Sequence, residues 1–329
     1  MLALTRNDVR RLVPMADAID LMKVAFRELS AGTAVAPLRT AIEVSPSNAD
    51  MLLMPAFVPA VRALGFKVVS VVRDNPSRGL PTINALVCLI DDVTGAPLAI
   101  MDGTYLTALR TGAVSGAATD LLARQDARTL VIIGAGAQGV TQAVAVCTVR
   151  PIERILVVDP SSEALHRYQD TVTRDWPDLA ARVELTSDAG AAVPVADVIC
   201  TATTSNVPVF DDADIKPGTH INAIGAYTPA MQEIPPATVT RAVVVVDQIE
   251  AALAEAGDLI KPLELGLVGR DHFSRELGTL VNGSVAGRES DEHVTLFKSV
   301  GNAVQDVVVA RRAVEQAEAT GAGQTILLT

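Results

Sequence analysis

The stretch that decides the fold is Thr129-Leu-Val-Ile-Ile-Gly-Ala-Gly-Ala-Gln-Gly-Val140, in which an apolar run leads into three glycines spaced Gly-x-Gly-x-x-Gly. Residues 129–133 predict a buried strand and residues 138–148 predict a helix, so the glycines occupy the turn between the two elements. A strand, a glycine-rich turn and a helix in this order are typical of a parallel sheet that binds a dinucleotide.

Each glycine of this turn has its own predicted role. Gly134 permits the tight turn out of the strand, and Gly136 lets the backbone approach a pyrophosphate. Gly139 lets the helix pack closely against the strand. Phosphates would then lie at the helix N-terminus, where free N–H groups and the helix dipole favour negative charge. The alternative is a glycine turn that is packed for structural reasons only.

A second strand, 154–159, ends in Asp159, about where a ribose-binding carboxylate belongs. A carboxylate there accepts hydrogen bonds from the ribose hydroxyls and repels a 2′-phosphate, so NAD(H) is favoured as the cofactor over NADP(H). NADP(H) stays open because Ser161 and Ser162, which follow soon after, could bind a phosphate. Farther on, the polar loop 201–206 follows another buried strand, where hydroxyl contacts to the cofactor are expected.

The two halves of the chain differ in their order of elements. Residues 14–31 have helical periodicity, and the strand-like segments after them have no helices between them, which predicts an antiparallel or mixed sheet. After residue 112 strands and helices alternate, which is typical of a parallel sheet with helices on both faces. The strands are expected at 39–45, 51–58, 64–72, 82–90, 97–101, 129–133, 154–159, 198–202, 220–224 and 242–246.

Two helical segments are expected near the end of the chain. Residues 294–319 have a helical pattern, and this long helix could pass back to the first half of the chain, because it needs a partner surface. Residues 250–258 are acidic and helical, and we expect them to form a solvated face that stops at Gly257.

Two basic residues stand in apolar surroundings. Lys67 lies within a strand-like apolar run, and Arg110 lies among small residues where the two patterns meet. Burial would depress the pKa of such a lysine, as catalysis requires, whereas an edge-strand position is the structural alternative. An arginine can bind a carboxylate through two parallel hydrogen bonds, although an inter-domain salt bridge is the alternative for Arg110. Arg39 is a third, weaker candidate.

Composition excludes several classes of function. With 27 basic and 38 acidic residues the formal charge is −11, so nucleic acid is not expected as a partner. Cys88, Cys147 and Cys200 are far apart in apolar runs, which indicates structural thiols and no metal site. No apolar run approaches the ~20 residues that a membrane helix needs, and the N-terminus lacks a secretory core, so we expect a cytoplasmic protein without a membrane partner.

Several ordered segments resemble the ornithine cyclodeaminase and mu-crystallin family. They are Gly79-Leu-Pro-Thr-Ile-Asn-Ala-Leu86, Thr94-Gly-Ala-Pro-Leu-Ala-Ile-Met-Asp-Gly103, Leu109-Arg-Thr-Gly-Ala113, Ile221-Asn-Ala-Ile-Gly225, Glu255-Ala-Gly-Asp-Leu259 and Phe297-Lys-Ser-Val-Gly-Asn-Ala-Val-Gln-Asp306. The resemblance spans nearly the whole chain. It implies an α/β fold in a homodimer, with a Rossmann-type doubly wound parallel sheet (113–304) inserted in an α+β substrate and dimerisation domain (1–112 and 305–329).

The resemblance also implies roles for individual residues. Lys67 is similar to the family's active-site lysine, Arg110 to its carboxylate-binding arginine and Arg39 to a second substrate-binding arginine. The expected cofactor-binding residues are Thr111, Gly134, Gly136, Ala137, Gln138, Gly139, Asp159, Thr201, Ala202, Thr203, Ser205 and Val300.

One departure from the family pattern bears on the reaction. True cyclodeaminases have an aspartate after Ile-Asn-Ala-Ile-Gly-Ala, whereas this chain has Tyr227, and a phenol cannot supply that carboxylate. The expected function is therefore an NAD(P)-dependent oxidoreductase that reduces a cyclic 2-imino carboxylate, such as Δ1-pyrroline-2-carboxylate or Δ1-piperideine-2-carboxylate. Tyr227 would be a proton relay or a pocket wall. The alternatives are an alanine dehydrogenase, an ornithine cyclodeaminase-type enzyme, and a non-catalytic protein that binds NAD(P)H or a small ligand.

Overall fold

The chain folds into two compact units. The structure is a computed structural model that describes residues 1–327, except for the side chain of Pro76. The first unit combines Met1–Arg110 with the chain from Asn302 onward, and the second is Thr111–Gly301. The boundaries expected from the sequence, after residues 112 and 304, lie two and three residues farther along the chain.

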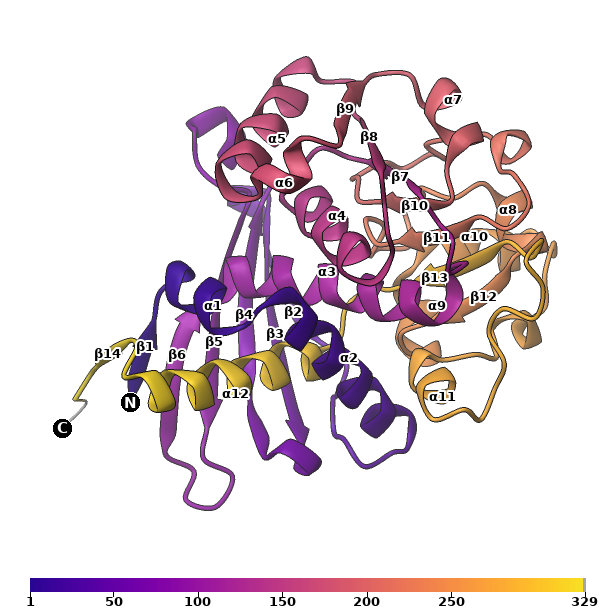
Figure 1. The fold of residues 1–329 in the computed structure, drawn as a ribbon. Coiled ribbons are helices and arrows are strands. Elements are labelled where there is room, and N and C mark those ends of the chain that lie inside the picture. Colours follow the sequence, from indigo (N-terminus) through magenta and orange to yellow (C-terminus); the bar gives the residue numbers. More distant parts are fainter. Residues whose placement is uncertain (328–329) are drawn as a thin grey trace. The chain divides into compact units, whose positions relative to one another are not determined.

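The first unit is built on a mixed seven-stranded sheet in the order β14-β1-β6-β5-β4-β3-β2 (Figure 1). Strands β2 to β6 are joined antiparallel, as the sequence predicts, while β1 pairs parallel with β6 and antiparallel with β14. The elements are β1 (Leu2–Leu4), α1 (Arg6–Leu12), α2 (Met15–Ser30), β2 (Thr40–Val44), β3 (Ala49–Val58), β4 (Ala63–Val72), β5 (Ile83–Ile90), β6 (Pro97–Asp102), α12 (Ala303–Thr320) and β14 (Gln324–Thr325).

The two faces of this sheet differ in burial. Helix α12 packs along β3, β4 and β5, and α2 packs on α12 (Figure 1). Residues of β4 that face the helix, such as Ala63 and Val69, are buried, whereas the alternate residues Leu64, Phe66 and Val68 remain partly exposed. Because side chains alternate along a strand, the sheet has one covered face and one open, apolar face.

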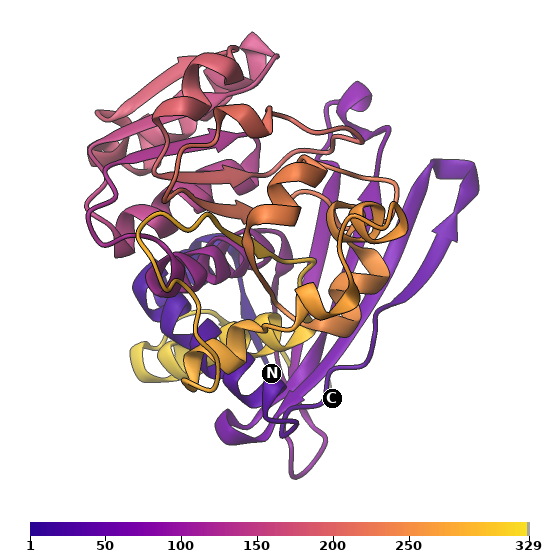
Figure 2. The same cartoon turned by 90° about the vertical axis from the view of Figure 1, so that its right-hand side faces the viewer.

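The second unit is a seven-stranded parallel sheet in the order β12-β13-β11-β10-β7-β8-β9. Along β7, Val131 and Ile133 join one apolar cluster and Leu130 and Ile132 join another, so helices cover both faces, as in a doubly wound sheet (Figure 2). The elements are β7 (Thr129–Ile133), α4 (Ala137–Val149), β8 (Arg154–Val158), α5 (Ser162–Asp175), α6 (Pro177–Ala180), β9 (Val183–Thr186), α7 (Ala189–Ala192), β10 (Val198–Thr201), β11 (His220–Ala223), α8 (Pro236–Arg241), β12 (Val243–Val246), α9 (Ile249–Glu255), α10 (Gly257–Glu264), α11 (Leu277–Val281) and β13 (Thr295–Lys298). The unit boundary falls within α3 (Gly103–Leu122).

Two expectations from the sequence were wrong. The helix expected at 294–319 begins only at Ala303, because Thr295–Lys298 is a strand buried between β11 and β12. A short apolar run has the same appearance in a buried strand and in a buried helix, so periodicity alone could not separate them. The segment 250–258 is not one solvated helix, because Gly257 opens α10 and Asp258 is fully buried.

Inside the second unit, His220 belongs to a buried neutral network. Its Nε2 donates to Asn222 Oδ1 at 3.2 Å, since an amide oxygen only accepts, and its Nδ1 lies 2.9 Å from Thr295 Oγ1. Asn222 Nδ2 donates in turn to the hydroxyl of Thr119 at 2.9 Å. Burial, with a further effect from the charge of Arg288, lowers the pKa of His220 to about 3.

This network should make stability depend on pH. The folded pKa of His220 lies below the ordinary 6.5, so its contribution is complete above pH 6.5 and is lost as the pH falls toward 3. We expect the free energy of unfolding to fall by up to about 1.4 kcal/mol per pH unit from this residue between pH 6.5 and 5. Urea unfolding of His220→Gln should show a shallower pH slope than wild type. His166→Gln, at an exposed histidine, is the control and should keep the slope of wild type. Equal pH slopes in wild type and His220→Gln would contradict the prediction.

Candidate functional site

A buried carboxylate joins the two basic residues that the sequence singled out. Asp306 Oδ2 lies 2.8 Å from Lys67 Nζ, and Asp306 Oδ1 lies 3.2 Å from Arg110 Nε. Only 1% of Lys67, 7% of Arg110 and none of Asp306 is exposed to solvent. Charged groups at this depth require partners, and here one acid serves two bases.

The fold brings these groups together from three distant segments. Lys67 lies on β4, on the face that α12 covers, and not on an edge strand as the structural alternative required. Asp306 lies in the first turn of α12. Gln305 Oε1 accepts from Arg110 Nη1 and from the Asn302 N–H, both at 2.8 Å, and therefore connects the arginine to the helix cap.

The local charge is positive. Two cations share one anion, which leaves one positive charge in excess, and the charge of Arg39 also reaches Lys67. Burial, the charge of Arg110 and the charge of Arg39 lower the pKa of Lys67, Asp306 opposes them, and the resulting pKa is about 7. The residues paired with Lys67 on the two adjacent strands are the apolar Met54 of β3 and Val87 of β5. Such a site favours a small anion with an apolar body, and its lysine can hold or release a proton at neutral pH.

The glycine turn of the second unit has the geometry that the sequence predicts. Gly134 has a φ of +108°, and a Cβ there would lie 2.6 Å from the carbonyl oxygen of Ala202. A Cβ on Gly139 would lie 2.3 Å from the carbonyl oxygen of Gly134, whereas one on Gly136 would meet nothing within 4 Å. Gly136 is the N-cap of α4 and brings no capping side chain. The turn therefore offers free N–H groups beside open space, which fits a pyrophosphate.

Asp159 stands at the end of β8 beside this turn. Its Oδ2 accepts from the Ala135 N–H at 2.9 Å, and its Oδ1 accepts from the Ser161 N–H at 2.9 Å. The hydroxyl of Ser161 accepts from the Ala164 N–H and so caps α5. Asp159 is half-buried, so its remaining acceptor positions can still meet a ribose.

The other expected cofactor residues lie at several places in the second unit. Thr201 ends β10, and among the described residues its buried hydroxyl has no hydrogen-bond partner. Thr203 and Ser205 lie in the loop that follows. The remaining candidates are Ala202 after β10, Ala137 and Gln138 in the first turn of α4, Thr111 in α3 and Val300 after β13.

Arg39 and Tyr227, the other two residues expected at the substrate site, stay predictions. Arg39 is half-buried just before β2, and Tyr227 is half-buried after β11 and packs against an apolar cluster of the second unit. The sequence-based prediction of site residues missed Asp306 and Gln305 altogether, although both lie in a segment that carries the family resemblance. An acid within the apolar run of α12 was the available signal, because it needs a partner as much as Lys67 does.

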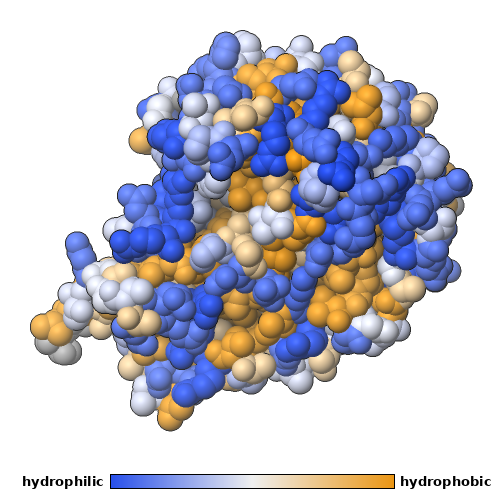
Figure 3. Space-filling model, in the orientation of Figure 1, coloured by the Kyte–Doolittle hydropathy of each residue, from blue (hydrophilic) through white to orange (hydrophobic). Residues whose placement is uncertain are grey.

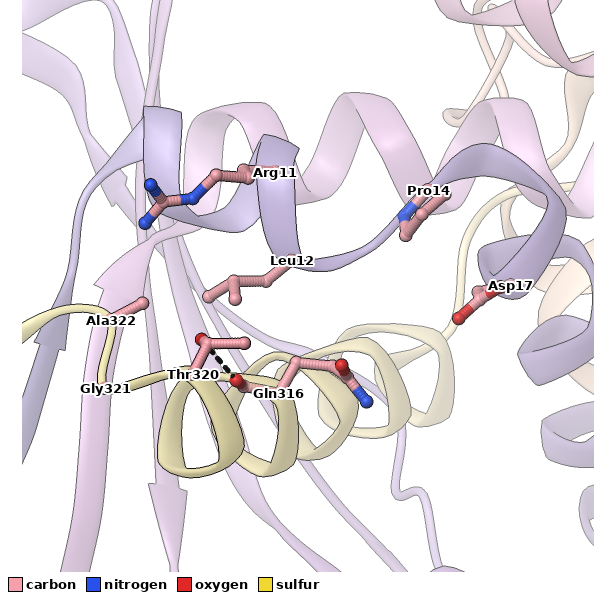
Figure 4. A pocket seen from close by; sticks show the side chains of 8 residues that line it. All are labelled: Arg11, Leu12, Pro14, Asp17, Gln316, Thr320, Gly321 and Ala322. Atoms are coloured by element: carbon pink, nitrogen blue, oxygen red, sulfur yellow. Dashed lines mark hydrogen bonds between the residues drawn. The ribbon is translucent and has the colours of Figure 1, made fainter.

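The first unit also has a cavity of about 520 Å³ between α1, the start of α2 and the end of α12 (Figure 4). Its walls include Arg11, Leu12 and Gln316, and no expected site residue lines it.

Among residues 1–327 no cluster of side chains fits a metal ion, and no helix is long and apolar enough to span a membrane. The face of the molecule that carries α12 shows hydrophobic residues among hydrophilic ones (Figure 3).

Comparison with known proteins gives the family. Residues 1–321 match the ornithine cyclodeaminase/mu-crystallin family. The chain belongs to this family. A Δ1-pyrroline-2-carboxylate reductase of Bacillus cereus is 41% identical over 327 residues, which are 99% of each chain.

Two solved structures have the same fold as this chain. The Δ1-pyrroline-2-carboxylate reductase of Thermococcus litoralis, in complex with NADH and L-proline, is 40% identical with a TM-score of 0.94, covering 99% of this chain and all of that one. An archaeal alanine dehydrogenase dimer with bound NAD is 34% identical with a TM-score of 0.91, covering 100% of this chain and 99% of that one.

Removing the shared carboxylate should destabilise the protein. In Asp306→Asn, Lys67 and Arg110 remain buried without a neutralising charge, which we expect to cost about 3–5 kcal/mol of unfolding free energy. Urea unfolding measures the loss. Glu184→Gln, which breaks an exposed ion pair with Arg154, should change stability little. If Asp306→Asn is as stable as Glu184→Gln, then Asp306 does not neutralise the two cations.

Proposed function

We infer that this protein is an NAD(H)-dependent reductase of the C=N bond in a cyclic 2-imino carboxylate of the Δ1-pyrroline-2-carboxylate type. The observation that carries this inference is the buried Lys67–Asp306–Arg110 group, which combines excess positive charge with a lysine of near-neutral pKa. A protein that only holds a cofactor needs neither feature. The full-length similarity to two such reductases supports the same reaction.

The substrate carboxylate would bind Arg110, with help from Arg39. The guanidinium of Arg110 is held by Asp306 at Nε and by Gln305 at Nη1, so its orientation is fixed before the substrate arrives. A preorganised cation loses little entropy on binding and aligns the imine carbon for reaction. Met54 and Val87 beside Lys67 suit the methylene groups of a small ring.

Reduction of C=N adds a hydride to carbon and a proton to nitrogen. NADH, when bound at the glycine turn and Asp159, supplies the hydride. Lys67 holds a proton that it can give up near neutral pH, because burial and the neighbouring arginines weaken its hold on the proton. Asp306 keeps the ammonium in place until the transfer. Tyr227 is a second candidate proton relay, half-buried after β11.

A second candidate function is alanine dehydrogenation, favoured by the 34% identity to the archaeal enzyme. An alanine dehydrogenase acting in the reductive direction would use pyruvate and free ammonia. Dependence on ammonia therefore separates the two reactions. Cyclodeamination is disfavoured because Tyr227 replaces the aspartate of that motif.

NADH oxidation at 340 nm tests the proposal. We expect rapid oxidation with Δ1-pyrroline-2-carboxylate or Δ1-piperideine-2-carboxylate, no need for ammonia, and a lower KM for NADH than for NADPH because of Asp159. Activity with pyruvate only when ammonia is present would identify an alanine dehydrogenase instead. NADH binding without any turnover would overturn the reductase proposal and favour a binding protein.

Lys67→Met is the matched variant for this assay. It removes the ammonium and keeps an unbranched side chain, so kcat should fall by about 10²–10⁴-fold. NADH affinity should stay within about twofold, because the expected cofactor residues do not include Lys67. Unchanged turnover would exclude the lysine from the reaction.

The protein is further proposed to act as a homodimer through the open face of the first sheet. Ile42, Leu53 and Leu86 lie on this face, together with the partly exposed Phe66 and Val68. Monomeric proteins rarely leave so continuous an apolar sheet face in water. A self-complementary patch of this kind suits a twofold interface, and the similar archaeal alanine dehydrogenase is a dimer.

Light scattering after gel filtration tests the dimer. The 34.4 kDa chain should elute at about twice its mass. Ile42→Lys, at a side chain that is 52% exposed, should shift the population toward monomer by placing a charge in the interface. Val93→Lys, at a 77% exposed residue in the turn between β5 and β6, is the control. A monomeric wild type at tens of micromolar would exclude this interface.

A further inference from the structure

One fully buried carboxylate, that of Glu233, connects two loops of the second unit. Its Oε1 accepts from the Thr203 N–H at 2.6 Å. Its Oε2 accepts from the N–H groups of Gly225 and Ala226 at 2.7 and 3.0 Å. The carboxylate thus satisfies three backbone donors that have no place in the parallel ladder.

Two further buried charges fix the segment that carries Glu233. Asp258 Oδ1 accepts from the N–H groups of Glu233 and Ile234 at 2.7 and 3.0 Å. Asp258 Oδ2 lies 2.9 Å from Lys298 Nζ, and both side chains are fully buried. The backbone on both sides of the Glu233 side chain is therefore held, and this side chain has little freedom to follow the loops if they move.

Two close backbone approaches leave no room for a Cβ atom in this cluster. A Cβ on Gly225 would lie 2.2 Å from the carbonyl oxygen of Thr203 and 2.5 Å from Glu233 Oε1. A Cβ on Gly257, the first residue of α10, would lie 2.0 Å from the carbonyl oxygen of Met231. Only glycine fits either position, so backbone lies directly against backbone in this cluster.

The position of the cluster in the sheet gives it a functional meaning. Thr203 follows β10, Gly225 follows β11 and Lys298 ends β13, so the cluster lies at the carboxyl ends of three parallel strands. Ligands of doubly wound sheets bind at that edge. The loops that Glu233 connects also carry the expected cofactor residues Thr203 and Ser205 and the candidate relay Tyr227.

We propose that Glu233 is a positioning residue that holds the 201–205 loop and the 225–227 loop in one fixed arrangement for the cofactor. This inference rests on the proposed function for its effect on imine reduction. Its cofactor part depends only on dinucleotide binding at the sheet edge. Only a carboxylate meets the requirement, because a glutamine side chain has one oxygen and would direct its NH₂ group at a backbone N–H.

Glu233→Gln tests the proposal, because it keeps the size of the side chain and removes one acceptor. We expect the dissociation constant for NADH, measured by NADH fluorescence, to rise at least fivefold. We expect kcat with Δ1-pyrroline-2-carboxylate to fall at least tenfold. Glu233→Asp keeps the charge but shortens the reach, so it should lie between wild type and Glu233→Gln, and it replaces Glu233→Gln if that variant does not fold.

Thr219→Val is the matched control for loss of stability alone. Thr219 is fully buried directly before the opposite end of β11, and its single hydroxyl proton is shared between Ala196 O at 3.2 Å and Lys216 O at 3.0 Å. This variant should lower Tm and leave NADH affinity and kcat within twofold of wild type.

The outcomes separate this inference from the proposed function. If the Glu233 variants lower Tm but match Thr219→Val in NADH affinity and kcat, the glutamate is merely structural and the inference is overturned. If wild type binds NADH but reduces no imine, the proposed function fails. NADH affinity alone then decides whether Glu233 positions the cofactor loop.

Discussion

The structure of the first unit depends on the neutralisation of two buried cations by one carboxylate. Lys67 and Arg110 both lie where water is largely excluded, and neither can stay charged there without an acid. Asp306 supplies that acid from the first turn of α12, 196 residues beyond Arg110. The return of the C-terminal helix to the first sheet is thus required by charge as well as by apolar packing. Asp306 neutralises only one of the two positive charges. A carboxylate ligand would bind the charge that remains.

The second unit uses buried carboxylates differently, as acceptors for backbone N–H groups. Asp247 Oδ2 accepts from the Ser299 hydroxyl and from the N–H groups of Val300 and Gly301, at 2.7–3.0 Å. Burial raises the pKa of Asp247, while these donors oppose the rise. Glu233 and Asp258 likewise accept hydrogen bonds from backbone N–H groups of the loops beside them. Each acid fixes an irregular segment after a strand, where no ladder partner exists.

What the sequence could predict follows from how local each signal is. The glycine turn and Asp159 were predictable because strand, turn and acid lie within 31 residues and each residue type has a steric or electrostatic reason. Lys67 and Arg110 were conspicuous because bases are rare in apolar runs. Their acid was not, because nothing in a sequence tells which distant carboxylate a buried base will meet. The same limit hid Lys298, whose segment was expected to be part of a long helix, and Asp258, whose segment was expected to be a solvated helical face. The division into separate domains stays a prediction.

The two ends of the parallel sheet show why the buried charges lie where they do. Toward the amino end of β11 the buried side chains His220, Asn222 and Thr295 are neutral, and His220 hydrogen-bonds both of the others. The half-buried Arg288 also donates to Thr295 Oγ1, at 3.2 Å. At the carboxyl ends the buried polar groups are ionic, and each acid accepts two or more backbone donors. A neutral network suffices to fill a core, since it needs only internal partners. Loops that must present N–H groups and side chains to a charged ligand have to be held rigid before the ligand arrives. A carboxylate has four acceptor positions, more than any neutral side chain, and can therefore hold several backbone N–H groups of two loops at once.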